Sequence, residues 1–479
     1  MSKTIPIVPV AIEAGYETTI NVAGHRKIYA RLAHGFWSNW RIAAVIITQL
    51  FFYLVPWWQI NGRQALLFDL ETFRFNVFGM VWLPQDLIYL AALLIFCAVA
   101  LFAWTAVAGR LWCGFGCPQT VYTEMFMWIE RWVEGERNAR IKLDRAPLSL
   151  AKVARKAVKH GLWIALALWT GFTFAGYFTP IRPLWQAMLT WRIGGWTTFW
   201  ILCYAFITYG HAGWLRERIC LHMCPYARFQ SAMFDRDTLV VSYDSQRGEP
   251  RGGRRKDADF GQQGLGSCVD CTVCVQVCPT GIDIRNGLQY ECIGCGACID
   301  ACNVVMDRMS YPRGLIRFTT EHAQANGAGK ATIARRMLRP KVLAYAAVLA
   351  VIVAASAIGL ARHQPLKLDI ARDRGILARQ TENGEIENLY TLTIQNVDHR
   401  PHRYRISAEG LPGLRLPQLA PVAVAAGGSE TVSLRLSVLK DTMPPGRHEI
   451  EIGVAAIDDP ALQVEEKTIF WGANGSDSG

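Results

Sequence analysis

The chain has 479 residues, of which 51% are hydrophobic and 17 are tryptophan, and its formal net charge is +11. The length excludes a single small domain, and the composition is unusual for a soluble enzyme. Because the basic residues gather beside apolar runs, the positive charge favours a membrane protein over a nucleic-acid-binding protein.

Residues 1–41 lack the apolar core and the small-residue cleavage pattern of a signal peptide, so we expect a cytoplasmic leader there. Five later runs of 17 or more residues contain no charged side chain, and each predicts a membrane-spanning helix. These runs are residues 42–58, 87–108, 161–179, 193–210 and 342–360. We therefore predict a membrane domain with four spans over residues 42–240 and a fifth span within residues 341–362. A buried core helix is the alternative for any single run, but five such runs make it a weak one.

The connecting segments differ in their number of Lys and Arg residues, which indicates orientation. Segments 59–86 and 180–192 contain two each, whereas segments 109–160 and 211–341 contain ten and eighteen. Basic loops stay on the cytoplasmic side, so the N-terminus and residues 211–341 are expected in the cytoplasm. The expected location is a bacterial inner membrane, in contact with membrane lipid, with the C-terminal part in the periplasm.

Two loops at the predicted cytoplasmic membrane edge share the form Cys-x3-Cys-Pro. They are Cys113 to Cys117 with Pro118, and Cys220 to Cys224 with Pro225, and we call them the Cys-Pro loops. Each follows an even-numbered span. If the loops meet, their four thiolates form a soft site suited to Cu(I), zinc or an additional iron centre, and they are our candidate catalytic and metal-binding residues. Alternatively, the four cysteines form redox-active dithiols, or they are small buried residues with a structural role.

Three histidines lie in the same region. His160 begins the third predicted span, His211 follows the fourth, and His222 lies within the second Cys-Pro loop. A neutral imidazole at this depth can ligate a metal or take a proton from a quinol. The alternative interpretation is that these are ordinary histidines at the water interface. Cys97 and Cys203 lie inside spans, where packing is the expected role.

Residues 241–266 contain a Gly- and Arg-rich run and are expected to be a flexible basic linker near an anionic leaflet. The run has no interleaved aromatic residues, which argues against nucleic-acid binding. The linker is expected to lead into an iron–sulfur module over residues 267–340.

Eight cysteines in this module follow the form Cys-x2-Cys-x2-Cys-x3-Cys twice, the bacterial ferredoxin pattern for two [4Fe–4S] clusters. In such runs the fourth cysteine ligates the other cluster. The predicted ligand sets are Cys268, Cys271, Cys274 and Cys302 for cluster 1, and Cys292, Cys295, Cys298 and Cys278 for cluster 2. Zinc sites and disulfides are the alternatives, but zinc usually takes two separated pairs and disulfides do not need this doubled register.

Residues 363–479 change to a period of two, with alternation typical of half-buried strands at 390–394, 432–438 and 449–454. Turn clusters at 382–384, 426–429 and 443–446 separate them. About seven short strands predict an immunoglobulin-like sandwich without a disulfide. The predicted fold is a polytopic α-helical membrane protein of about five spans. It carries an inserted α+β ferredoxin-like module and this C-terminal all-β sandwich.

The combination of five spans, two Cys-Pro loops, a double-cluster ferredoxin and an outer β-domain resembles the CcoG/FixG/RdxA family. The resemblance covers essentially the whole chain, and the order of its parts is more specific than the ferredoxin motif alone. These relatives are accessory proteins of cbb3-type cytochrome c oxidase assembly. The resemblance implies reduction of Cu(II) to Cu(I), with copper, oxidase assembly factors or a copper transporter as partners. It leaves the electron donor open.

Two other functions remain open. A quinol dehydrogenase would use the Cys and His residues at the membrane edge to oxidise quinol, and an assembly scaffold would use the sandwich to dock a partner. The chain contains no Rossmann fingerprint, no P-loop and no credible Ser/His/Asp arrangement.

Overall fold

The computed structural model describes residues 27–256, 264–327, 330–362, 365–372, 378–381, 384–398, 400–439 and 446–472. Most of the predicted leader, part of the predicted linker and parts of the predicted turns at 382–384 and 443–446 lie outside these residues. The chain divides into two compact units. The first consists of Met1–Val45, Ala108–Trp163 and His211–Ile333, and the second of Ile46–Val107, Ile164–Gly210 and Ala334–Gly479.

All five predicted spans coincide with helices. These are α1 (Phe36–Leu54), α2 (Leu87–Ala108), α6 (Leu150–Ala175), α8 (Gly195–Tyr209) and α15 (Pro340–Ala361). Among the described residues, three helices are long and apolar enough to cross a membrane: Phe36–Trp57, Leu87–Ala108 and Pro340–Ala361. Helix α8 has only 15 residues, too few for a bilayer core of about 30 Å at 1.5 Å per residue. It continues into a π-helical turn at Gly210–Leu215. Crossing by α6 and α8 therefore stays a prediction.

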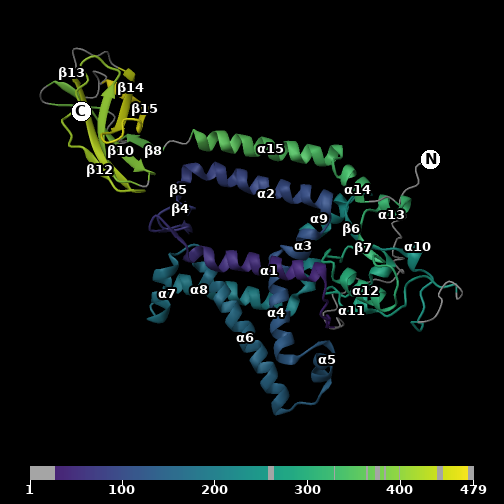
Figure 1. The fold of residues 1–479 in the computed structure, drawn as a ribbon. Coiled ribbons are helices and arrows are strands. Elements are labelled where there is room, and N and C mark those ends of the chain that lie inside the picture. The colour runs from purple at the N-terminus through teal and green to yellow at the C-terminus, as the bar shows by residue number, and fades with distance from the viewer. Residues whose placement is uncertain are drawn as a thin grey trace, which may run out of the picture. The chain divides into compact units, whose positions relative to one another are not determined.

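Helices α2 and α15 lie side by side and antiparallel in the second unit (Figure 1). Arg339 before α15 donates to the carbonyl of Ala106 at the end of α2, at 2.5 Å. At the other end, a Cβ added to Gly359 would lie 2.8 Å from the Tyr89 hydroxyl. In each of these two helices, an apolar window of 18 residues contains no buried residue in the described protein. Helices that are apolar all round and uncovered by protein are suited to lipid.

Short elements that the sequence analysis did not predict connect these helices in the second unit. The segment between α1 and α2 forms two small antiparallel sheets. Their strands are β1 (Gln59–Ile60) with β2 (Arg63–Gln64), and β3 (Leu66–Asp69), β4 (Arg74–Val77) and β5 (Met80–Trp82). Helix α7 (Ile181–Leu189) lies between α6 and α8.

The first unit contains the cysteine motifs. Its other helices are α3 (Leu111–Phe115), α4 (Pro118–Glu134), α5 (Arg137–Arg145), α9 (Pro225–Met233), α10 (Ser245–Gly248), α11 (Val273–Gln276), α12 (Ala297–Arg308) and α13 (Glu321–Asn326). Helix α14 (Lys330–Met337) follows them and runs into the second unit. The Asp300 carboxylate on α12 accepts hydrogen bonds from the amides of Trp37 and Ser38, so it caps the first turn of α1.

The described part of the basic linker is folded against the iron–sulfur module, so our prediction of a flexible tether is wrong there. Strand β6 (Val240–Tyr243) pairs antiparallel with β7 (Ile316–Thr319), which follows the last cluster cysteine. The amide of Cys268 donates to the carbonyl of Gly248, and the amide of Gly252 donates to the carbonyl of Cys268. Composition alone did not reveal these backbone pairings, because they join segments that are distant along the chain.

The C-terminal part is an immunoglobulin-like sandwich, as predicted, with eight strands among its described residues in two antiparallel sheets. One sheet contains β8 (Leu366–Arg372), β9 (Arg379–Gln380), β10 (Glu385–Asn396) and β13 (Ser429–Leu439). The other contains β11 (His402–Glu409), β12 (Val422–Val424), β14 (Gly446–Ala456) and β15 (Gln463–Gly472). In β10 the even-numbered residues are buried, which is the period of two read from the sequence.

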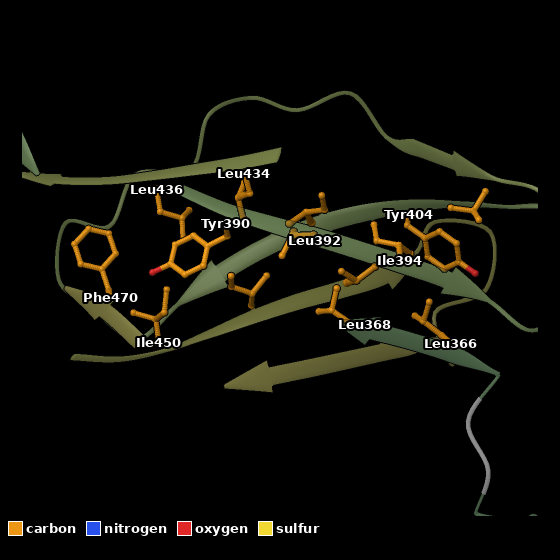
Figure 2. Packing of buried hydrophobic residues seen from close by; sticks show 14 of the residues in the cluster. Leu366, Leu368, Tyr390, Leu392, Ile394, Tyr404, Leu434, Leu436, Ile450 and Phe470 are labelled. Atoms are coloured by element: carbon orange, nitrogen blue, oxygen red, sulfur yellow. The ribbon is translucent and has the colours of Figure 1, made fainter. Parts of the chain in front are cut away.

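Figure 2 shows the core of this sandwich, where Tyr390, Leu392, Leu434, Ile450 and Phe470 meet between the sheets. All five are fully buried. Because the core forms between the inner faces of the two sheets, it accounts for the stability of the domain without a disulfide.

Candidate metal centres

The eight ferredoxin-type cysteines line two cavities in the first unit. The four cysteines that line the first are Cys268, Cys271, Cys274 and Cys302. The second is lined by Cys278, Cys292, Cys295 and Cys298, and also by Cys274. Cys298 and Cys302 lie on one face of helix α12, one turn apart, and Cys298 lines the second cavity while Cys302 lines the first.

Local backbone conformation explains how the second run wraps around its cavity. Gly294 and Gly296, on either side of Cys295, have φ angles of 65° and 73°. Glycine adopts this left-handed region without steric cost, so the loop can curl around Cys295. A Cβ on Gly296 would also lie 2.7 Å from the Trp37 side chain.

The donor set and the burial of these cavities fit a cluster of several irons. Burial raises the pKa of Cys302 to about 12, with its three neighbours in the first cavity adding to the rise. Burial also raises the pKa of Cys292 to about 12. Such thiols need bound cations to become thiolates. Four thiols around each cavity supply the four cysteine ligands of a [4Fe–4S] cluster. Among the described residues, which include the thiols of the Cys-Pro loops, no group of three or more His, Cys, Asp or Glu side chains is placed to hold a single metal ion.

The Cys-Pro loops place a thiol at the start of a helix twice. Cys117 precedes Pro118 of α4 and Cys224 precedes Pro225 of α9, and in both helices proline takes the first position. Proline is suited to this position because its missing N–H has no partner to lose there. Burial raises the pKa of Cys117, while hydrogen bonds from the amides of Thr120 and Gln119 lower it in part.

The structure brings the two Cys-Pro loops together. The Cys113 thiol donates to the Gln230 side chain of α9 at 3.4 Å, which joins the first loop to the helix of the second. From α4, Gln119 donates to the carbonyl oxygens of His211 and Arg216 at 3.0 Å each. Burial raises the pKa of Cys113 to about 12 and that of Cys220 to about 11, and in both cases the Cys117 thiol is the next largest cause. The hydrogen bonds of Cys113 and Gln119 thus hold the two loops against each other.

The first Cys-Pro loop also packs against the second ferredoxin cavity. A Cβ on Gly114 would stand 2.9 Å from the Cα of Cys295 and 2.9 Å from the carbonyl oxygen of Ile293. Cys113 packs on a buried apolar cluster that includes Val277, Ile293 and Cys295. The backbones of the two metal-binding motifs are thus in direct van der Waals contact, with glycine at the point of closest approach.

The three histidines are placed differently. The His160 ring lies 6.0 Å from the Trp214 ring in a stacked arrangement and 5.1 Å from the Trp163 ring at its edge. His211 contributes its backbone carbonyl to the Gln119 contact, and His222 is exposed in a π-helical turn (Ile219–Met223). Their roles as metal ligands or proton acceptors stay predictions.

Sequence reasoning missed two residues that organise this region, Arg110 and Gln230. Arg110 donates to the carbonyl of Tyr290, just before Cys292, and to the carbonyl of Ala227 on α9. The only local signal was an arginine three residues before Cys113, and that does not distinguish it from an ordinary arginine at a membrane edge.

Comparisons with known proteins agree with this arrangement. Residues 215–321 match the family model of a 4Fe-4S dicluster domain, and residues 90–135 match that of a 4Fe-4S binding domain. The second match contains Cys113 and Cys117. Residues 356–473 match the Ig-like fold at the C-terminus of FixG.

Similarity extends over nearly the full length of two curated relatives. The nitrogen fixation protein FixG of Rhizobium meliloti is 35% identical, over 91% of this chain and 90% of its own. The chain belongs to the FixG/RdxA family. Protein RdxA of Cereibacter sphaeroides is 36% identical, over 85% of this chain and 88% of its own. The ferredoxin-type protein NapH of Haemophilus influenzae is 20% identical, over 44% of this chain and 66% of its own.

The family and the cysteine motifs make the chain an iron–sulfur redox protein, and its apolar helices associate it with a membrane. An iron–sulfur protein of this kind transfers electrons one at a time.

Proposed function

We propose that this protein is a membrane-bound cupric reductase that supplies Cu(I) for the assembly of a cbb3-type cytochrome oxidase. The two ferredoxin-type cysteine sets, Cys268/Cys271/Cys274/Cys302 and Cys278/Cys292/Cys295/Cys298, hold the clusters. The Cys-Pro loops receive copper as the substrate. The membrane is the inner membrane of a bacterium, with the iron–sulfur module in the cytoplasm and the sandwich in the periplasm.

The observation that carries this proposal is the contact between the first Cys-Pro loop and the second ferredoxin cavity. Gly114 lies on the backbone of Cys295, and the Cys-Pro loops lie on each other through the Cys113–Gln230 hydrogen bond. A substrate held by these thiols is therefore next to a ligand of cluster 2. This contact between the loop and the Cys295 backbone allows electron transfer over a short distance without movement of the chain.

The thiols also match the chemistry of the product. Cu(II) becomes Cu(I) by gaining one electron, and the clusters, when bound, supply electrons singly. Cysteine thiolates prefer the softer Cu(I), so binding at Cys113, Cys117, Cys220 and Cys224 favours the reduced form. The 4Fe-4S family match over Cys113 and Cys117 leaves an additional iron centre at the same thiols as the competing occupant.

The test uses the full-length protein, purified in detergent without oxygen. Iron analysis should give about eight irons per chain, the number in two [4Fe–4S] clusters. After reduction with dithionite and its removal, Cu(II) is added, and Cu(I) formation is followed together with cluster reoxidation by EPR. We expect one Cu(I) for each electron lost by the clusters.

Two double variants locate the site. Cys117→Ala with Cys224→Ala should abolish Cu(I) formation while the iron of the two clusters is retained. Cys97→Ala with Cys203→Ala, which changes two cysteines inside α2 and α8, is the matched control and should leave the reaction unchanged. Copper reduction that persists in the first variant would place the reaction elsewhere.

Two other outcomes would change the proposed function. Clusters that ignore Cu(II) but are reoxidised by a quinone would indicate quinone chemistry. Clusters that react with neither would leave an assembly scaffold as the function.

A further inference from the structure

Arg110 is a buried cation at the junction of the three cysteine motifs. It lies between α2 and α3, three residues before Cys113, and its side chain is almost fully buried. One guanidinium nitrogen donates to the carbonyl of Tyr290 and another to the carbonyl of Ala227. The side chain thereby connects the ferredoxin module to the helix that follows the second Cys-Pro loop.

Within the described part of the chain, no carboxylate forms an ion pair with Arg110, and its Nε atom has no hydrogen-bond partner. Other arginines near the clusters differ in this respect. Arg41 pairs with Glu124 at 2.8 Å, and Arg285 pairs with Asp283 at 2.7 Å. A buried charge without a counter-charge is strongly unfavourable, so Arg110 requires an anion from another source.

The carbonyls that Arg110 contacts lie close in sequence to cysteines of different motifs. Tyr290 stands two residues before Cys292 of the second ferredoxin run, and Ala227 stands three residues after Cys224 of the second Cys-Pro loop. A Cβ on Gly294, in the same ferredoxin run, would lie 3.3 Å from the carbonyl carbon of Arg110. A single guanidinium is thus held between segments of both centres.

We propose that Arg110 is the shared counter-charge of two metal–thiolate centres, the cluster at Cys278/Cys292/Cys295/Cys298 and the centre at the Cys-Pro loops. This inference rests on the cluster ligand set of the proposed function. An arginine side chain stays protonated in proteins, so its charge is fixed and it exchanges no proton during the reaction. An electron taken up by either centre adds one negative charge, and Arg110 stabilises that state more than the oxidised one. Arg110 is therefore a positioning residue that raises the electron affinity of both centres.

Redox titration of the full-length protein, followed by EPR in the absence of copper, tests this role. Arg110→Gln removes the charge and keeps a hydrogen-bond donor. The reduction equilibrium constant of the cluster beside Cys292 should fall at least tenfold, which is about 59 mV for a one-electron couple. The midpoint potential of the cluster at Cys268 should stay unchanged, because no described contact joins Arg110 to that cavity.

Arg110→Lys keeps the charge and loses the planar fork, so its potentials should match those of the unchanged protein. Arg313→Gln, at an exposed arginine of the same module, is the control for a general loss of positive charge and should shift neither potential. If Arg110→Gln fails to retain iron, the Arg110→Lys variant provides the test. Retained clusters with unchanged midpoint potentials in Arg110→Lys support the role of charge. Lost clusters or lowered midpoint potentials in this variant overturn it.

Three results would overturn the inference directly: no shift in Arg110→Gln, an equal shift of both clusters, or an equal shift in the Lys and Gln variants. Because these titrations contain no copper, a failure of the unchanged protein to reduce Cu(II) would refute the proposed function without affecting this result.

Discussion

Gly114→Ala is the sharpest test of the contact between the first Cys-Pro loop and the second ferredoxin cavity. The added Cβ would stand 2.9 Å from the Cα of Cys295, 2.9 Å from the carbonyl oxygen of Ile293 and 3.0 Å from the amide nitrogen of Cys295. All three are backbone atoms, so no side-chain rotation relieves the clash. The two loops must separate, or the chain must shift.

The expected cost follows from these distances. Overpacking a tight site costs about 1–3 kcal/mol, and three backbone contacts at 3.0 Å or less place this site near the upper limit. Alanine in place of a helical glycine recovers roughly 0.5–1 kcal/mol, because glycine has more conformational freedom to lose. A net loss of about 2 kcal/mol remains. It weakens the packed arrangement relative to the separated one by roughly 30-fold.

Thermal denaturation followed by loss of cluster absorbance measures this change, and Cu(II)-driven cluster reoxidation measures its effect on electron transfer. We expect a lower denaturation temperature and slower reoxidation at unchanged iron content. Gly161→Ala is the matched control, since a Cβ on Gly161 in α6 meets nothing within 4 Å. That variant should be as stable as the unchanged protein or slightly more so. A Gly114→Ala protein with unchanged stability and rate would refute the close backbone contact.

Two further predictions concern charged groups outside the cysteine motifs. Burial lowers the pKa of His402, but its hydrogen bonds to Asp398 and Asp458, at 2.9 and 2.8 Å, outweigh this and raise it above the usual value. Protonated His402 should therefore stabilise the folded sandwich fully below about pH 6.5, and this stabilisation should be lost as the pH rises through the higher folded-state pKa. Melting curves of the protein at several pH values should show this loss. His402→Gln should remove this pH dependence. Burial raises the pKa of Glu130, yet four surrounding basic side chains lower it to about 2. Glu130→Gln should cost about 3–5 kcal/mol, because it leaves Arg140 and Arg216 without a carboxylate partner. The exposed Glu449→Gln should change thermal stability little, and equal effects of the two glutamate variants would contradict the argument.

Local patterns predicted much of this architecture. An apolar run predicts a helix because every backbone group must be hydrogen-bonded within the segment, and all five runs are helical. The alternation in residues 390–394 predicts a strand because successive side chains point to opposite faces, and β10 has that period. Where local patterns failed, as in the Arg-rich linker, distant partners decided the conformation. Its residues Gly248 and Gly252 pair with the backbone of Cys268.

The sequence by itself determined which residues can bind metal and which segments suit lipid, because ligand spacing and apolar length are properties of short stretches. Only the tertiary structure decided that the Cys113 thiol reaches Gln230 of α9 and that Gly114 lies on Cys295. It also decided that Arg110 is enclosed between the carbonyls of Tyr290 and Ala227. These contacts join segments more than a hundred residues apart. Their geometry depends on how helices and loops pack, and no local spacing encodes it.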